Sequence, residues 1–135
     1  MASEAVIIEL LGEPKGCPIE LVCADVDAFP KGTIIKLADD RTASLSAAGG
    51  DVCGGICAME KVTLDGSLRV SVYTNGIFDL VESNTGTPAV GTGIIINGAN
   101  LVTGEAAGDA ELGKIMGHAL ATFAKAGTEA VRVLL

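Results

Sequence analysis

The stretch Leu68–Val81 constrains most strongly the fold that this chain can adopt. It begins with a run in which apolar residues alternate with polar ones, the two-residue period of a strand with one buried face. Asn75-Gly76 follows, after which apolar residues resume. Asn-Gly between two such runs is typical of a β-hairpin, since both residues tolerate positive φ. One long strand with a bulge at Gly76 is the alternative, and the stretch contains no obvious catalytic group.

Glycine recurs throughout the sequence, with 18 glycines in 135 residues. That share is about double the usual one, and frequent glycines between short β-branched runs predict many tight turns and a mainly β fold. The chain has only three Phe, one Tyr and no Trp, so we expect a core of Val, Ile, Leu, Ala and Cys. Its length predicts one domain that buries its own core.

The charge balance excludes some classes of partner. The chain has 17 acidic and 9 basic residues, a net charge of −8, and no basic cluster. Phosphate groups are bound by Lys and Arg, so we expect no nucleic acid partner and no anionic membrane partner. The charge fits either a solvent-facing exterior or ordinary solubility.

The beginning of the sequence does not resemble a secretory signal, because it lacks a positive segment and Glu4 and Glu9 interrupt its apolar run. The longest uncharged stretch, Ser83–Gly104, is rich in Gly, Asn and Thr and contains Pro88. These residues favour loops and strands over a membrane span. We therefore expect a soluble protein made in a cytoplasm.

Similar signals predict further short strands along the chain. Pro18 marks the first of these as an edge-type strand, because proline cannot donate to a ladder. Asn97-Gly98 predicts a second hairpin. We find no clear internal repeat. The expected strands are Cys17–Cys23, Thr33–Ala38, Val52–Lys61, Gly93–Ile96, Ala99–Val102 and Ala130–Leu135.

The stretch Leu112–Phe123 is ambiguous between helix and strand. Its apolar residues fit helical spacing, but Gly113 and Gly117 would each cost about 1 kcal/mol relative to Ala inside a helix. We favour a strand over Lys114–Thr122, preceded by a short helix or helical turn at Ala106–Leu112.

The four cysteines and the single histidine are the candidates for chemistry. Cys53 and Cys57 have a spacing that suits zinc, but Cys17 and Cys23 lie too far apart. We expect buried thiols, no metal and no cofactor, since free Cys behaves as a small buried apolar residue. His118 belongs to no catalytic motif, so we expect it to be partly buried or at an interface and the protein not to be an enzyme.

Several short motifs follow one another in a distinctive order. They are Lys31–Ile34, Leu37–Asp40, Gly54–Ala58, Val72–Phe78, Gly117–Leu120 and Val131–Leu134. In order and spacing they resemble the head decoration (capsid cement) proteins of tailed bacteriophages, the family of the bacteriophage lambda head decoration protein. The resemblance covers about residues 17–135.

This resemblance implies a small, mainly β, barrel-like domain at residues 15–135, which forms a homotrimer on the exterior of the phage capsid. It implies a virion protein that is assembled in the host cytoplasm and that binds the major capsid protein. It also implies that residues 1–14 form an extended arm, which pairs with capsid strands and becomes ordered on binding. The candidate arm residues are Val6, Ile7, Ile8, Leu10 and Leu11.

The residues alone leave two alternatives open for this terminal strand. It can pair with the domain's own sheet or, by β-strand addition, with a neighbouring chain. Two other functions also remain open: a structural subunit of another phage assembly, such as a tail or shell, and a small ligand-binding β-barrel.

Overall fold

The computed structural model describes residues 4–82, 88–105, 108, 113–120 and 130–134. These residues form strands and no helix, which confirms the mainly β prediction. The helical turn expected at Ala106–Leu112 lies outside the described residues, apart from Gly108. The strands are β1 (Val6–Glu9), β2 (Ile19–Val22), β3 (Ile34–Asp39), β4 (Thr42–Leu45), β5 (Cys53–Cys57), β6 (Arg69–Tyr73), β7 (Ile77–Glu82), β8 (Gly93–Ile96), β9 (Leu101–Gly104), β10 (Gly117–Ala119) and β11 (Ala130–Leu134).

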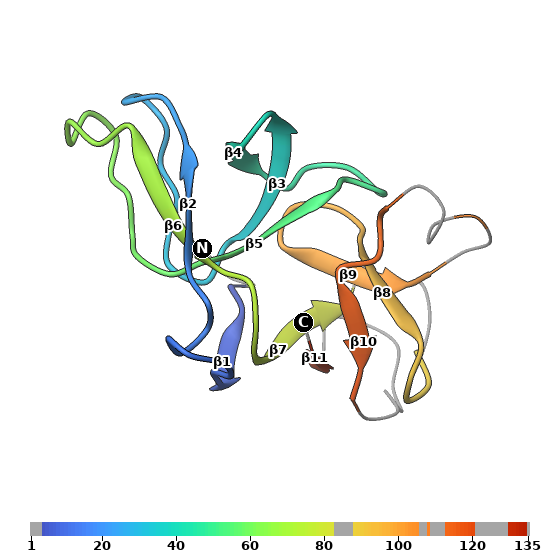
Figure 1. The fold of residues 1–135 in the computed structure, drawn as a ribbon. Helices are drawn as coiled ribbons and strands as arrows, with labels where there is room; N and C mark the ends of the chain where they lie inside the picture. Colours follow the sequence, from blue (N-terminus) through green and yellow to red (C-terminus); the bar gives the residue numbers. More distant parts are fainter. Residues whose placement is uncertain (1–3, 83–87, 106–107, 109–112, 121–129, 135) are drawn as a thin grey trace.

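Strands β2 to β6 form a closed barrel in the order β2-β4-β3-β5-β6 (Figure 1), which we call the first ring. The ring closes because β6 pairs with β2 along the whole of Ile19–Val22. Alternate residues of each strand point inward, as the two-residue period requires. The interior contains Leu21, Ile35, Cys57, Val70 and Val72, among others. The barrel-like prediction is therefore confirmed.

The strand expected at Cys17–Cys23 corresponds to β2, which lies between β6 and β4 in this ring, so the prediction of an edge strand is wrong. Pro18 immediately precedes Ile19, the first paired residue. Its missing N–H therefore removes no hydrogen bond from the ladder. Proline here marks the beginning of a strand and not an edge.

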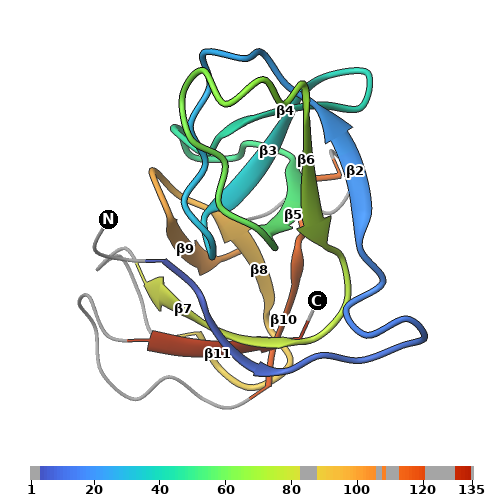
Figure 2. The ribbon, with the colours of Figure 1, turned by 90° about the vertical axis from the view of Figure 1, so that its left-hand side faces the viewer.

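Strands β7 to β11 curl into a second ring, and β1 lies outside it against β7 (Figure 2). The order is β7-β11-β10-β8-β9, and β9 returns to pair in parallel with β7. β8 and β9 are antiparallel around Asn97-Gly98, which confirms that hairpin. β10 and β11 confirm strands within Lys114–Thr122 and Ala130–Leu135, whereas residue 112 and residues 121–123 lie outside the described residues.

The hairpin predicted at Asn75-Gly76 is wrong, because the flanking strands belong to different rings (Figure 1). β6 pairs with β2 and β5, whereas β7 pairs with β1, β9 and β11. Gly76 has a φ of 145°, and a Cβ added to it would lie 2.8 Å from the Glu9 carbonyl oxygen. Only glycine fits where the chain leaves one ring and enters the other. A chain bent at Gly76 describes this crossing better than a hairpin.

The two rings repeat one topology, strand for strand. β2 to β6 correspond in order to β7 to β11, and each ring contains one parallel pair, β2–β4 or β7–β9. The remaining pairs within both rings are antiparallel. The expectation of no clear internal repeat is therefore wrong at the level of structure.

The strand registers of the two rings also agree at the pairs that both rings share. Equivalent pairs are Leu21–Val70 and Leu80–Val131, Ile35–Leu45 and Ile94–Gly104, and Ile35–Gly55 and Ile94–Gly117. Identical residues at equivalent positions include Leu21 and Leu80, Val22 and Val81, Gly32 and Gly91, Thr33 and Thr92, and Ile35 and Ile94. Single identities scattered in this way do not stand out in the sequence.

The turn that precedes β3 recurs before β8. Gly32 and Gly91 have φ values of 88° and 85°. The Gly32 N–H donates to the Cys57 carbonyl at 2.9 Å, and the Gly91 N–H donates to the Ala119 carbonyl at 2.8 Å. A residue with a side chain would be strained at these φ values, which accounts for glycine in both copies.

An apolar row on the outside of the first ring joins the two rings. Ile34, Ile56 and Tyr73 are paired side by side across β3, β5 and β6. Ile34 and Ile56 belong to the core of the second ring, and each contributes on the order of 2 kcal/mol by burial. The ring of Tyr73 lies 6.4 Å from that of Phe78, measured between centroids. The first ring therefore supplies part of the second ring's core.

Asn100 adds polar contacts at the same junction. Its Oδ1 accepts a hydrogen bond from the Ile34 N–H at 2.9 Å, and its own N–H donates to Ser46 Oγ at 2.9 Å. Asn100 is 2% exposed and has a φ of 57°, a left-handed conformation that Asn adopts more readily than most residues. The β8–β9 turn is thereby fixed to the first ring.

Replacing Asn100 with glycine should lower the free energy of unfolding by about 1–3 kcal/mol, because it leaves the buried Ile34 N–H without its acceptor. Glycine keeps the positive φ, so backbone strain does not contribute. Urea unfolding measures the loss. Ala99→Gly, at an exposed position of the same turn, is the control, and equal losses in the two variants would contradict the assigned role.

Candidate binding surfaces

The predicted arm residues lie on and just after β1, which pairs antiparallel with the beginning of β7. Ile7 and Leu10 are half-buried and pack against the core of the second ring. Leu11 is half-buried as well. Val6 and Ile8 point away from that core, with 59% and 41% of their surface exposed. The segment thus has one face that belongs to the domain and one apolar face that meets solvent.

β1 is the outermost strand of its sheet, so its outer edge has no strand beside it among the described residues. The N–H and C=O groups along such an edge are a template for another strand. The Ala5 N–H donates to the Gly32 carbonyl at 2.8 Å, which ties the beginning of β1 to the first ring. Pairing with the domain's own sheet therefore leaves one edge available, and capsid binding by this segment stays a prediction.

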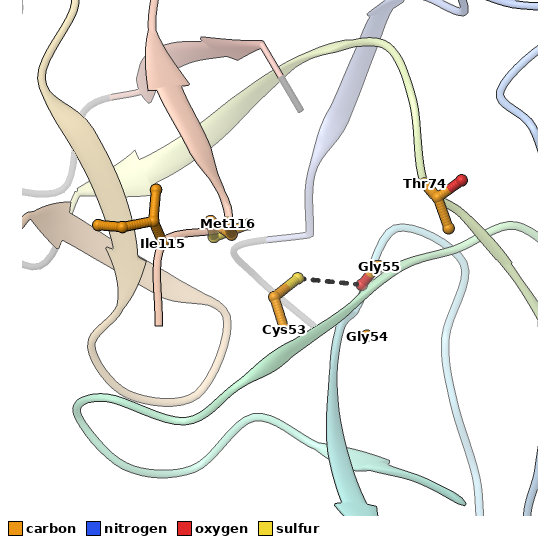
Figure 3. A pocket seen from close by; sticks show the side chains of 6 residues that line it. All are labelled: Cys53, Gly54, Gly55, Thr74, Ile115 and Met116. Carbon is orange, nitrogen blue, oxygen red and sulfur yellow. Dashed lines mark hydrogen bonds between the residues drawn. The ribbon is translucent and has the colours of Figure 1, made fainter. Parts of the chain in front are cut away.

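A pocket of about 160 Å³ lies where the first ring meets the segment before β10 (Figure 3). Small-molecule sites usually exceed about 300 Å³ and have convergent polar groups. The hydroxyl of Thr74 already donates to the Cys17 carbonyl at 2.7 Å, and Cys53 Sγ lies 4.0 Å from the Gly55 carbonyl oxygen. This pocket is therefore a poor ligand site. Its lining consists of Cys53, Gly54, Gly55, Thr74, Ile115 and Met116.

The four cysteines are free thiols. Cys23 and Cys57 are buried in the core of the first ring, as predicted, whereas Cys17 and Cys53 are half-buried. Burial raises the pKa of Cys53 and that of Cys57 to about 11. In the described part of the chain, no group of three or more His, Cys, Asp or Glu side chains is placed to hold a metal ion.

Cys53 and Cys57 should resist alkylation by iodoacetamide in the folded protein at about pH 8, because a thiol with a pKa of about 11 is almost wholly protonated there. Both should react fully in urea. Mass spectrometry of peptides from the two samples measures this difference. Rapid labelling of Cys53 in the folded protein would contradict its assigned environment.

His118 is exposed on β10, where it pairs with Gly93 of β8 and Leu134 of β11. The prediction that it is partly buried is wrong for the single chain. Its inward neighbours, Gly117 and Ala119, are buried instead, because successive residues of a strand point to opposite faces. The prediction of an interface position stays open.

Sequence reasoning missed Lys61, whose side chain is only 3% exposed. Its ammonium donates to the carbonyls of Asp25 and Asp27 at 3.1 Å and of Val62 at 3.3 Å, and pairs with Asp65 at 3.1 Å. A buried ammonium requires such partners. Lys61 thereby ties together the β2–β3 and β5–β6 loops at one end of the first ring. No local pattern marks this role, because two of its acceptors lie far away in the sequence.

Lys61→Met should lower the free energy of unfolding by on the order of 3 kcal/mol, because it leaves several buried or half-buried oxygens without their donor. Lys31→Met, at an exposed position, is the matched control. Urea unfolding of the two variants measures the difference. A Lys61→Met variant as stable as the control would show that the ammonium does not hold the loops.

Among the described residues, no helix is long and apolar enough to cross a membrane. None of the protein-family models compared with the chain matches it, and the search among curated proteins found no match. The case for a function therefore rests on the molecule's own surfaces and on the order of its sequence motifs.

Proposed function

We propose that this protein decorates the exterior of expanded phage heads as a homotrimer and stabilises them. Its partner would be the major capsid protein. The order of its motifs, from Lys31–Ile34 to Val131–Leu134, supports the proposal because it resembles that of head decoration proteins. The observation that carries it is the edge strand β1, with Val6 and Ile8 exposed along it.

The free edge of β1 suits β-strand addition, in which main-chain hydrogen bonds supply much of the affinity. Each such bond contributes a net of about 0.5–1.5 kcal/mol, and burial of Val6 and Ile8 adds about 25 cal/mol per Å². β1 has only 4 residues, so one arm binds weakly. Three arms in a homotrimer multiply this affinity through effective concentration.

In this proposal the arm is already ordered as a strand before it binds the capsid. The resemblance implies an arm that becomes ordered on binding, but β1 already pairs with β7. A strand held in its binding conformation loses less conformational entropy when its partner arrives. In this proposal, β7 holds the inner edge of β1 while a capsid strand takes the outer edge.

Stabilisation of a shell requires no chemical step. A protein that binds the expanded shell, and neither the unexpanded nor the disrupted one, shifts the equilibrium toward the expanded form by mass action. The net charge of −8 favours solubility of a protein on a capsid exterior.

A variant with Val6→Asp and Ile8→Asp should lose affinity for expanded heads by at least about tenfold, because a carboxylate replaces each apolar contact of the proposed interface. Its fold should persist, since both side chains are exposed. Co-sedimentation with expanded heads measures binding, and circular dichroism monitors the fold.

The matched control is Val62→Asp with Leu64→Asp, two residues that are 56% and 68% exposed in a loop of the first ring. This control should bind heads like the wild type. Undiminished binding by the folded Val6 and Ile8 variant would refute the assignment of β1 as the capsid-binding strand.

A further inference from the structure

One end of the second ring is covered, while the equivalent end of the first ring is open. Phe78 and Ile96, near the β8–β9 turn, are both 0% exposed. Their equivalents by strand register, Ile19 and Leu37, are 41% and 39% exposed. Two large apolar side chains of the inward-facing set therefore meet solvent at the β3–β4 end of the first ring.

The outer face of the first ring covers this end of the second ring, and the first ring lies above the second in Figure 2. Ile34 and Ile56 of the outer row enter the second ring's core, and Asn100 at the β8–β9 turn accepts from the Ile34 N–H. The contact is head to tail, because the outer face of one ring meets the turn end of the other.

The second ring carries an equivalent outer row of its own at Gly93 and His118, which are paired across β8 and β10. Gly93 has no side chain, but Ile115 fills the space, since its Cδ1 lies 2.9 Å from where a Cβ of Gly93 would be. His118 is exposed. The molecule therefore presents the outer face of the second ring on one side and the open end of the first ring on another.

We propose that a second copy of this chain covers the open end of the first ring, head to tail. The face of one copy that contains Gly93, Ile115 and His118 would lie against Ile19 and Leu37 of the next copy. This contact between chains would repeat the packing of an outer face against a turn end that joins the two rings within one chain.

The charges of the residues that would meet between two copies favour a second copy of this chain as the partner. Within the chain, the Asn100 N–H donates to Ser46 Oγ. By strand register Arg41 is equivalent to Asn100, and Glu105 to Ser46. Arg41 and Asn100 also share a positive φ, 47° and 57°. The same contact between two copies would therefore join a guanidinium to a carboxylate.

Both groups are accessible for such a pair. Arg41 is exposed and donates from Nη2 to the Glu20 carbonyl at 2.9 Å, which uses one of its five N–H donors. Glu105 is exposed, and its Oε1 accepts from the Gly93 N–H at 3.3 Å, which holds the carboxylate beside the outer row. An Arg–carboxylate pair would fix the orientation of two chains that otherwise repel each other through their acidic surfaces.

A head-to-tail contact either closes into a ring or continues as a filament. The number of copies rests on the proposed function, which expects a homotrimer, whereas the contact residues do not depend on it. Three chains would place six five-stranded rings around one axis.

Charge reversal tests the contact. Arg41→Glu and Glu105→Arg should each raise the dissociation constant of the oligomer at least about tenfold, and the variant with both reversals should recover most of the loss. Native mass spectrometry and analytical ultracentrifugation measure assembly, while circular dichroism confirms folding. Lys31→Glu and Glu60→Arg are controls at exposed positions elsewhere on the first ring and should assemble like the wild type.

A wild-type chain that stays monomeric, single reversals that assemble normally, or a folded double reversal that stays dissociated would each overturn the inference. Expanded-head binding of the same proteins separates it from the proposed function. Assembly that ignores Arg41 and Glu105 while decoration persists overturns only this contact. Assembly that responds to both residues, in a protein that binds no heads, overturns only the proposed function.

Discussion

The rest of the structure depends on the packing of Ile34 and Ile56 against the core of the second ring. A five-stranded ring of this size encloses few residues, and small cores supply little stability. By contributing an outer row, the first ring completes the core of the second, so that the two halves support each other. The buried Asn100 bonds fix their relative position, because a buried amide is stable only where its partners are met.

Local signals in the sequence predicted the positions of turns better than they predicted which strands pair with each other. Asn97-Gly98 and Asn75-Gly76 are the same dipeptide between apolar runs, yet only the first joins paired strands. At Asn75-Gly76, β7 pairs instead with β1, β9 and β11, which come from distant parts of the sequence. The apolar segment at Val6–Glu9 was visible as a strand for the same local reason, but its pairing with β7 was not.

The internal repeat and the buried lysine were hidden for different reasons. The ring interior requires apolar character without fixing identity, so Ile19 is matched by Phe78, and the identities that remain, such as Gly32 and Gly91, are scattered along the two halves. Lys61 was missed because its acceptors come from separate loops that only the closed ring brings together. A charged residue near a strand end carries no sequence signal of burial.

Two exposed features take no part in the fold of the domain itself: the outer edge of β1 and the open end of the first ring. We assign the edge of β1 to contact with a shell and the open end to contact with a further copy of the chain.

The most direct test of the shell role mixes the purified chain with expanded and unexpanded heads of a tailed phage. Co-sedimentation and the disruption temperature of the heads are then measured. We predict binding to expanded heads alone, with a raised disruption temperature; equal binding to both forms, or binding without any rise, would contradict the role in stabilisation.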